Sequence, residues 1–327
     1  MRRFLFAILL LIPLIARAQS ACDSIRISLL TCTPGEELYA RYGHTAIRVL
    51  DTANETDYVF NYGIFDFDTE AFYWKFVKGE TWYELGLCPT LYFVSEYAAE
   101  NRDIYEQVLN LTTEQKANLL RALDTNYQPC NRKYLYNFVF DNCATRPYRL
   151  LLSVLGDSIH STYTGAEGMT YRRFIQHYTR PYSIADMGIN LIFGSRADQC
   201  MQGEERLFLP EELMLYLSEA TLSDGTPVVS QERIGHFDIR PVPFWANAHI
   251  WIALMLLIVV CISLRDHRLH RISKWLDILF LCVFGLLLII VTFLTFFSIH
   301  PLVGFSYRLI VILLLYICAR LLSIFPR

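Results

Sequence analysis

The residues best suited to covalent chemistry are a cysteine, a histidine and an amide: Cys143, His44 and Asn61. A cysteine attacks a carbonyl carbon as its thiolate, so it needs a positive potential nearby and a base that takes its proton. A histidine can be that base near neutral pH. The base must present the correct ring nitrogen to the thiol, and an amide on an adjacent strand can orient it. These three residues therefore form a candidate catalytic set.

Pro147 locates Cys143 relative to a helix. Proline lacks an amide hydrogen, so a helix tolerates it in the first turn, where that hydrogen would have no partner. An unkinked helix containing Pro147 must begin close to Ala144, which predicts that Cys143 is the N-cap. The positive end of the helix dipole favours a thiolate there, and free backbone amides can receive an oxyanion. The alternative is a small core residue or half of a disulfide.

The histidine and its orienting residue are predicted on two paired strands. Polar and apolar residues alternate from His44 to Leu50, which indicates a strand that begins at His44. The aromatic run Tyr58–Phe67 is prone to form a strand and is expected to pair with the first as a hairpin. Asn61 is the first candidate for orienting His44 and Asp66 is the second. Either side chain could instead hold a turn.

Further strands and helices are expected to frame these residues. The strands expected from alternation and composition are Ser24–Leu29, Thr81–Leu87 and a strand-like run at Tyr134–Cys143. Helices are expected after the capping box of Thr112 and Gln115, from Ala144 to the closing Gly156, at Tyr171–Tyr178, and from Pro210. The apolar segment Met187–Gly194 is interpreted as core, with a lid or lipid-facing surface as the alternative. Val228–Pro243 is expected to be an extended linker.

Several classes of function are excluded by charge and spacing. The net charge of -3 gives no basic footprint for nucleic acid. The histidines of the central part of the chain are scattered, without the spacing of a metal site, at positions 44, 160, 177 and 236. A phosphate loop, a nucleophile elbow and a paired-carboxylate signature are also missing from the sequence. We therefore expect no metal, no cofactor and no nucleic-acid partner.

The start of the chain is predicted to direct its export. Residues 1–18 combine a basic start, an apolar run and a small-residue end, which is the pattern of a secretory signal cleaved after Ala18. A lipoprotein-type processing site before Cys22 is the alternative.

The end of the chain is predicted to anchor it in a membrane. Three apolar segments, each long enough to span a bilayer, occupy Phe244–Leu264, Trp275–Phe297 and Gly304–Phe325. The basic loop 265–274 between the first two should remain in the cytoplasm by the positive-inside rule. Residues 19–243 are then an exported domain, and residues 244–327 are a membrane anchor of three transmembrane helices.

The exported part contains six cysteines whose pairing cannot be derived from their spacing, at positions 22, 32, 88, 130, 143 and 200. Export exposes thiols to oxidation, so some could form disulfides. A catalytic Cys143 must stay unpaired.

Three motifs together resemble the periplasmic domain of the Lnb-type lipoprotein N-acyltransferases. They are Tyr42-Gly43-His44-Thr45-Ala46-Ile47-Arg48-Val49, Phe60-Asn61-Tyr62-Gly63-Ile64-Phe65-Asp66-Phe67 and Tyr136-Asn137-Phe138-Val139-Phe140-Asp141-Asn142-Cys143-Ala144-Thr145-Arg146. The resemblance implies an α+β, circularly permuted papain-like domain, with a small antiparallel sheet and a Cys-bearing helix, followed by transmembrane α-helices. Histidine-bearing strands precede the cysteine helix in that fold, as His44 precedes Cys143 here.

The resemblance also implies an activity and a location. The expected enzyme is a cysteine-dependent acyltransferase of the bacterial inner (cytoplasmic) membrane, with its catalytic domain on the periplasmic side. Its substrate would be a diacylglyceryl lipoprotein, or a phospholipid as acyl source, and an acyl chain would pass through a Cys143 thioester to the α-amino group of the lipoprotein's N-terminal cysteine. His44 would be the base and Asn61 its orienting residue. A lyso-form lipoprotein would be the product.

Two alternatives remain open from the sequence. The same Cys–His pair could serve a papain-like amidase, peptidase or lipid esterase in which water is the acceptor. A membrane-anchored binding module without catalysis would be indicated if Cys143 were held in a disulfide.

Overall fold

The computed structural model describes residues 24–65, 68, 70–156, 159–179, 183–239, 243–271 and 273–304, together with 307, 310, 311 and 314. The predicted signal (residues 1–18), Cys22 and Asp66 lie outside the described residues, as does most of the third predicted membrane span. The chain forms two compact units. The sheet unit comprises Met1–Phe72, Thr81–Glu167 and Gln202–Asp238, and the membrane-helix unit comprises Tyr73–Glu80, Gly168–Met201 and Ile239–Arg327.

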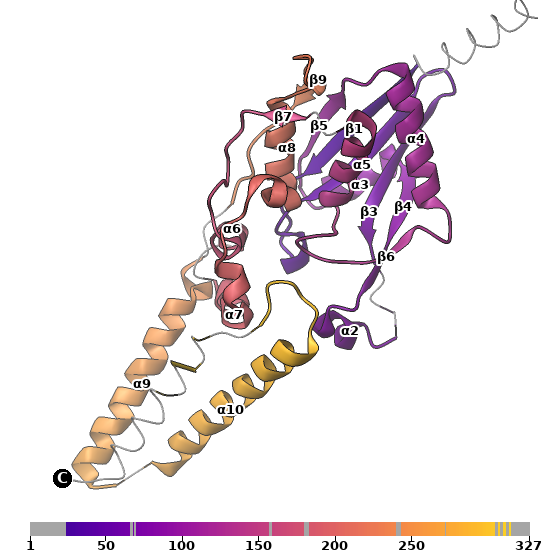
Figure 1. Ribbon diagram of the computed structural model, residues 1–327. Helices are drawn as coiled ribbons and strands as arrows, with labels where there is room; N and C mark the ends of the chain where they lie inside the picture. Colours follow the sequence, from indigo (N-terminus) through magenta and orange to yellow (C-terminus); the bar gives the residue numbers. More distant parts are fainter. Residues whose placement is uncertain are drawn as a thin grey trace, which may run out of the picture. The chain divides into compact units, whose positions relative to one another are not determined.

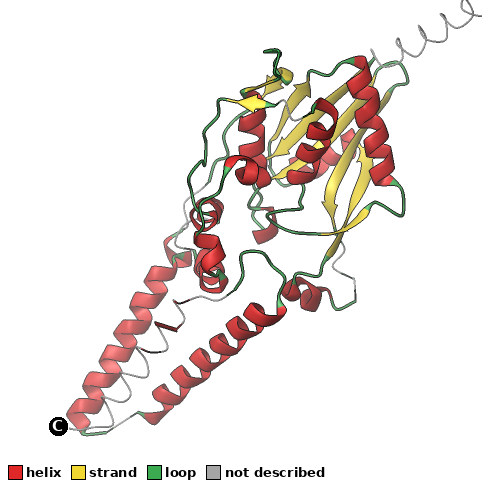
Figure 2. Ribbon diagram, viewed as in Figure 1, coloured by secondary structure: helices red, strands yellow, loops and turns green. Residues whose placement is uncertain are grey.

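The sheet unit is built on a seven-stranded antiparallel sheet (Figures 1 and 2). Its spatial order is β6-β4-β3-β2-β1-β5-β9. The strands are β1 (Ile25–Cys32), β2 (His44–Asp51), β3 (Thr56–Ile64), β4 (Trp82–Pro89), β5 (Ile104–Leu109), β6 (Lys133–Leu135) and β9 (Val229–Arg233). A separate ribbon pairs β7 (His160–Ser161) with β8 (Ala220–Thr221). The expected mixed α and β class with an antiparallel sheet is confirmed.

Helices cover both faces of this sheet because its strands alternate apolar residues between two cores. Leu29 of β1 lies in a core with α4 (Thr113–Tyr127), α5 (Thr145–Leu155) and α8 (Pro210–Ser218). Its neighbour Leu30 points to the opposite face, where Phe93 and Tyr97 of α3 (Thr90–Ala99) pack. Short 3₁₀ helices η1 (Leu38–Ala40) and η3 (Gly203–Phe208) complete the unit.

The predicted hairpin that carries His44 and Asn61 is confirmed. β2 begins at His44 and pairs antiparallel with β3, with Ile47 opposite Phe60. β3 ends at Ile64, earlier than the predicted Phe67, after a bulge between Tyr62 and Ile64 in its pairing with β4. The bulge bends the strand at the end that carries the candidate site.

The predicted helix signals of the sheet unit are also confirmed. Thr112 and Gln115 form the capping box that opens α4. Gly156 ends α5 with φ +77°, a conformation that favours glycine. Pro210 is the first residue of α8, where its missing amide hydrogen costs no helical bond.

Two segments differ from the prediction. The strand-like run Tyr134–Cys143 pairs with β4 only through β6 and then turns, because Asn137 Oδ1 accepts hydrogen bonds from the amides of Val139 and Phe140. A side-chain oxygen that bonds the following amides competes with a strand ladder. The predicted linker Val228–Pro243 begins as β9, which pairs with β5 at the edge of the sheet.

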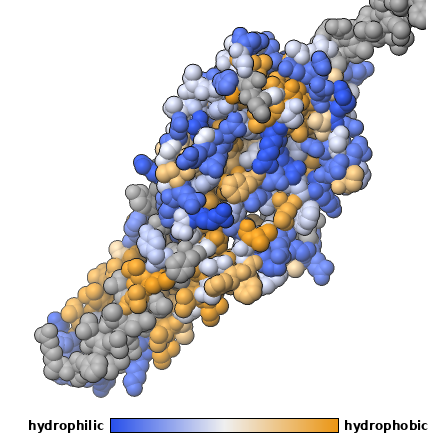
Figure 3. All heavy atoms as spheres, viewed as in Figure 1, coloured by the Kyte–Doolittle hydropathy of each residue, from blue (hydrophilic) through white to orange (hydrophobic). Residues whose placement is uncertain are grey.

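The membrane-helix unit contains two helices long and apolar enough to span a bilayer, α9 (Ala248–Leu269) and α10 (Lys274–Phe297). Most of their side chains are exposed, unlike those of a core helix in a soluble protein. Hydrophobic residues dominate their surface in Figure 3. These helices correspond to the first two predicted spans. The rest of the unit comprises residues 73–78 of α2 (Phe72–Lys78), α6 (Tyr171–Tyr178), α7 (Ile184–Ile192), η2 (Ser195–Asp198) and η4 (Phe244–Ala246).

Arg172 joins α6 to the end of α7. Its buried guanidinium pairs with Asp198 at 2.6 Å and donates to the carbonyl oxygens of Asn190, Phe193 and Gly194. These carbonyls lie at the C-terminal end of α7, where helical partners run out. In the segment Met187–Gly194, predicted to be core, only Phe193 and Gly194 are buried, and Met187 is 46% exposed.

Candidate active site

His44 and Asn61 form a direct hydrogen bond across the β2–β3 hairpin. His44 Nε2 lies 2.6 Å from Asn61 Oδ1. An amide oxygen only accepts hydrogen bonds, so the Nε2 nitrogen carries the hydrogen of the neutral ring. The lone pair is then on Nδ1, which is free to accept a proton. The bond thus selects the tautomer that a general base requires.

Asn142 positions Cys143 at the start of α5. The Asn142 side chain is 2% exposed, and its Oδ1 accepts from the amides of Ala144 and Thr145, each at 2.9 Å. Its Nδ2 donates to the carbonyl oxygens of Phe138 at 2.7 Å and Phe208 at 2.8 Å. These four bonds fix the residues on both sides of Cys143.

Asn142 had no predicted role, although one signal pointed to it. An asparagine directly before an expected helix start is a preferred capping residue. The N-cap of α5 is Ala144, so Cys143 lies one residue earlier than predicted. The capping oxygen at this helix comes from Asn142, and the cysteine side chain is left available for other contacts.

Cys143 meets the strand that carries His44. The backbone amide of Thr45, the residue after His44, is close enough to the Cys143 sulfur to favour its thiolate. Gly63 on β3 lies against both side chains, since a Cβ atom there would be 3.7 Å from His44 Cε1 and 3.8 Å from Cys143 Cβ. Gly63 has φ +103°, so its backbone conformation also favours glycine. The three predicted residues are therefore brought together at one end of the β2–β3 hairpin.

Burial makes both titratable groups of the pair neutral near pH 7. It raises the pKa of the Cys143 thiol to about 11, although the amides of Thr45 and Cys143 favour the thiolate. Burial lowers the pKa of His44 to about 4, and the bond to Asn61 opposes this only in part. The sequence predicted that the helix start would favour the thiolate, but desolvation outweighs that effect here. The resting state is a thiol facing an uncharged imidazole.

Aromatic side chains surround the pair. The ring of Tyr97 stacks on His44 with centroids 6.4 Å apart, and Tyr83 stacks on Tyr136 at 4.1 Å. Burial raises the pKa of Tyr83, Tyr97 and Tyr136, and a negative charge on Cys143 would raise it further. Such surroundings restrict water and strengthen electrostatic interactions within the site.

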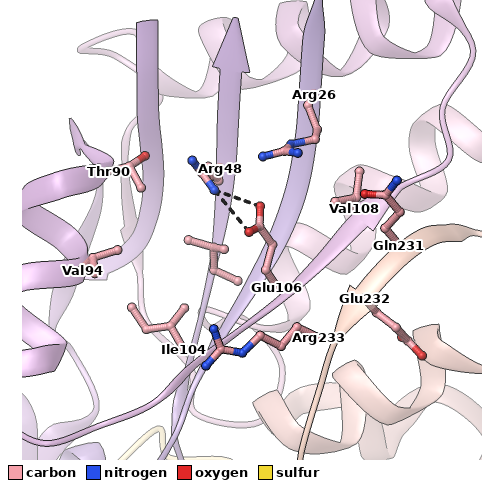
Figure 4. Close-up of a pocket in the computed structure, with 11 residues that line it drawn as sticks. Arg26, Arg48, Thr90, Val94, Ile104, Glu106, Val108, Gln231, Glu232 and Arg233 are labelled. Atoms are coloured by element: carbon pink, nitrogen blue, oxygen red, sulfur yellow. Dashed lines mark hydrogen bonds and ion pairs between the residues drawn. The ribbon is translucent and has the colours of Figure 1, made fainter. Parts of the chain in front are cut away.

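A separate cavity of about 390 Å³ lies on the sheet and contains none of the three candidate residues (Figure 4). It is lined by residues that include Arg26, Arg48, Glu106 and Arg233. Arg48 is paired there with Glu106 at 3.1 Å and also with Asp57 at 2.7 Å. We interpret these ion pairs as structural links between strands.

The described cysteines are free thiols, at positions 32, 88, 130, 143, 200, 261 and 282. Cys143 is thus available for reaction. Within the described part of the chain, no group of three or more His, Cys, Asp or Glu side chains is arranged to hold a metal ion.

A cysteine beside a helix start, facing a histidine that an amide orients, is the arrangement that cysteine-dependent acyl-transferring and hydrolysing enzymes use. The chain belongs to the family of the Lnb N-terminal periplasmic domain, whose model matches residues 15–180, half of the sequence. The matched region includes His44, Asn61 and Cys143. No curated protein and no solved structure matches the chain. The protein therefore combines a periplasmic domain of this family with helices able to span a membrane.

Proposed function

We propose that the protein is a lipoprotein N-acyltransferase of the bacterial inner membrane, with Cys143 as nucleophile, His44 as base and Asn61 as the residue that orients His44. The observation that carries the proposal is the 2.6 Å bond from His44 to Asn61 beside a free thiol that faces the same hairpin. A circularly permuted papain-like fold is part of this proposal. The order of the elements supports it, because the His44 strand precedes the Cys143 helix.

The first half-reaction is acyl transfer to the enzyme. The Cys143 sulfur attacks an ester carbonyl of the diacylglyceryl group while His44 Nδ1 takes the thiol proton. The backbone amides of Thr45 and Cys143 favour negative charge on the attacking sulfur. The carbon–oxygen ester bond then breaks, and His44 returns its proton to the leaving glyceryl oxygen. An acyl thioester on Cys143 and a lyso-form glyceryl group result.

The second half-reaction passes the acyl chain to nitrogen. The α-amino group of the lipoprotein's N-terminal cysteine attacks the thioester carbonyl, and His44 Nδ1 takes a proton from that nitrogen. The carbon–sulfur bond breaks, and His44 protonates the departing Cys143 sulfur. An amide forms and the thiol is restored, so no oxidant, reductant or metal is needed.

The neutral state of His44 is the protonation state that a general base requires near pH 7. A histidine with a pKa of about 4 is fully unprotonated at pH 7 and can accept the thiol proton. The aromatic surroundings also disfavour water, which competes with the amine for the thioester. The restriction of water favours transfer over hydrolysis, whereas the unprotonated His44 could serve either acceptor.

The proposal includes the placement of the chain. Residues 1–18 would be a cleaved signal, residues 19–243 the periplasmic catalytic domain and residues 244–327 the membrane anchor. Such an anchor would keep the site close to acyl chains that remain in the bilayer.

The test is mass spectrometry of lipoprotein N-terminal peptides from cells that depend on this protein for N-acylation. We expect Cys143→Ser and His44→Ala each to abolish the N-acylated lyso-form product. Cys130→Ser, which changes an exposed free thiol, is the matched control and should leave the product unchanged. Persistence of the product in both site variants would refute the proposal.

The purified full chain distinguishes transfer from hydrolysis. Incubation with a diacylglyceryl peptide should yield N-acyl peptide when the α-amine is free. Release of free fatty acid with no N-acyl peptide would instead identify a lipid esterase.

A further inference from the structure

The short helix α2 presents a large aromatic surface. Tyr73, Trp74, Phe76 and Val77 are 75%, 56%, 48% and 39% exposed. Contiguous apolar surface of this kind marks an interaction site, since water solvates it poorly. This aromatic surface of α2 belongs to the membrane-helix unit. Helix α2 is attached there directly to the end of α10.

Two contacts attach α2 to α10. The amide of Ile299, just beyond the end of α10, donates to the carbonyl oxygen of Lys78 at 2.8 Å. The ring of Trp74 lies 5.1 Å from that of Phe293, in the last turns of α10. Helix α2 therefore lies beside the end of α10 (Figure 1).

Gly79 allows the close approach of the two segments. Its φ is +78°, and a Cβ atom at this position would lie 3.1 Å from Ile299 Cγ1 and 3.2 Å from the His300 amide nitrogen. His300 Nε2 also lies 2.8 Å from the carbonyl oxygen of Phe76. The end of α2 is thus fixed in place, which fixes the direction in which its aromatic side chains point.

Helix α7 presents a second exposed apolar face in the same unit. Ile184 and Met187, three residues apart on one side of the helix, are 54% and 46% exposed, whereas Asp186 is buried. The helix is held at both ends. Ser183 forms a β-bridge with Asn247, the N-cap of α9, and the amide of Gly194 donates to the carbonyl oxygen of Leu302 at 2.9 Å.

Helices α2 and α7 are therefore both attached to the part of the unit where α9 begins and α10 ends. The basic segment 265–274 includes the last residues of α9 and the first residue of α10, and by the positive-inside rule it faces the cytoplasm. The start of α9 and the end of α10 are then on the exported side. Phe244 and Trp245, just before α9, are 75% and 63% exposed there, as interfacial anchors are.

We propose that α2 and α7 are interfacial helices that lie in the phospholipid headgroup region of the exported leaflet. Their interfacial surface consists of Tyr73, Trp74, Phe76, Ile184 and Met187. The occupant is lipid because both helices are bonded to the ends of α9 and α10, whose own exposed side chains are mostly apolar. Tryptophan and tyrosine rings favour that depth, and an apolar face on a short helix can lie in the plane of the interface. The proposal rests on the membrane placement of α9 and α10 and does not depend on acyl transfer.

The experiment measures tryptophan quenching by phospholipids brominated near the headgroup end of the acyl chain. The full chain is reconstituted in nanodiscs, and the difference between wild type and Trp74→Phe gives the signal of Trp74. We expect brominated lipid to reduce this signal about twofold and the aqueous quencher acrylamide to have little effect, as at an interfacial position. Replacing tryptophan by phenylalanine keeps an aromatic ring, so the fold is not at risk.

Two introduced tryptophans give a matched comparison. In the Trp74→Phe background, Met187→Trp places the probe on the exposed face of α7. His177→Trp places it on the exposed polar side of α6. Quenching of the probe at position 187 by brominated lipid, and of the probe at 177 by acrylamide, supports the proposal.

Two outcomes would overturn it. Trp74 and the probe at position 187 could be quenched by acrylamide as strongly as the probe at 177, which would place them in water. Alternatively, protection from both quenchers would show that protein, instead of lipid, covers the surface.

Discussion

The protonation state of Cys143 can be tested by the pH dependence of its alkylation. Iodoacetamide reacts with the thiolate, so the rate follows the thiolate fraction. Burial raises the pKa of Cys143 from 9.0 to about 11. At pH 8 the folded protein should therefore contain about 100-fold less Cys143 thiolate than the unfolded chain, since each pH unit is a factor of about ten.

The assay counts alkylated and free Cys143 peptide by mass spectrometry over time, from pH 6 to pH 11. We expect the rate to rise about tenfold per pH unit up to about pH 10 and less steeply as the pH approaches the pKa of about 11, as for an isolated high-pKa thiol. The same peptide in urea-unfolded protein is the reference, and its rate should level off above about pH 9. Steric protection would lower every rate equally and leave the slope unchanged, so the slope is the informative quantity.

The His44→Ala variant completes the test. A neutral imidazole does not stabilise the thiolate by charge, so the slope should persist when His44 is removed. The reasoning would be refuted if the alkylation rate of the wild type were constant from pH 6 to 8 and the rate of His44→Ala were not. It would show that the resting state is a thiolate–imidazolium ion pair.

Other variants and conditions test neighbouring parts of the site. Asn61→Ala should lower turnover more than tenfold with little change in substrate affinity, measured by steady-state kinetics, because it releases the His44 tautomer. Gly63→Ala should lower the free energy of unfolding by about 1 kcal/mol or more, measured by denaturant titration, because Gly63 has φ +103°, a conformation that strains a residue with a Cβ atom. Asn142→Ala should lower the free energy of unfolding by about 2 to 4 kcal/mol, measured by denaturant titration, since buried amide and carbonyl groups lose their partners. Because the pKa of His44 falls from 6.5 to about 4 on folding, the unfolded chain binds the extra proton, and stability should drop as pH falls from 6.5 to 4. The His44→Gln variant should show a smaller drop.

The hairpin of the site could be predicted because its signals are local. Alternation beginning at His44 and the aromatic run around Asn61 determine two strands, and the turn between them is short. Pro147 likewise placed the start of α5 to within one residue. The prediction was less successful at 136–143, where Asn137 and Asn142 bond to backbone groups and replace a strand with turns.

The parts that could not be predicted depend on partners far away in the sequence. β9 has no strong alternation of its own and becomes a strand by pairing with β5, more than a hundred residues earlier. The neutral state of Cys143 likewise depends on burial by aromatic residues from several elements, and no local motif encodes that. Asp66, the second candidate for orienting His44, lies outside the described residues.

The membrane-helix unit is assembled from three separate stretches of the chain, and this has a consequence for biosynthesis. Residues 73–80 and 168–201 leave the ribosome well before residues 299–304, to which both are bonded. These two stretches must therefore remain incompletely paired until residues 299–304 have been synthesised. During that interval the aromatic residues of α2 are exposed to aggregation and proteolysis. Residues 299–304 thus determine when residues 73–80 and 168–201 can complete their pairing.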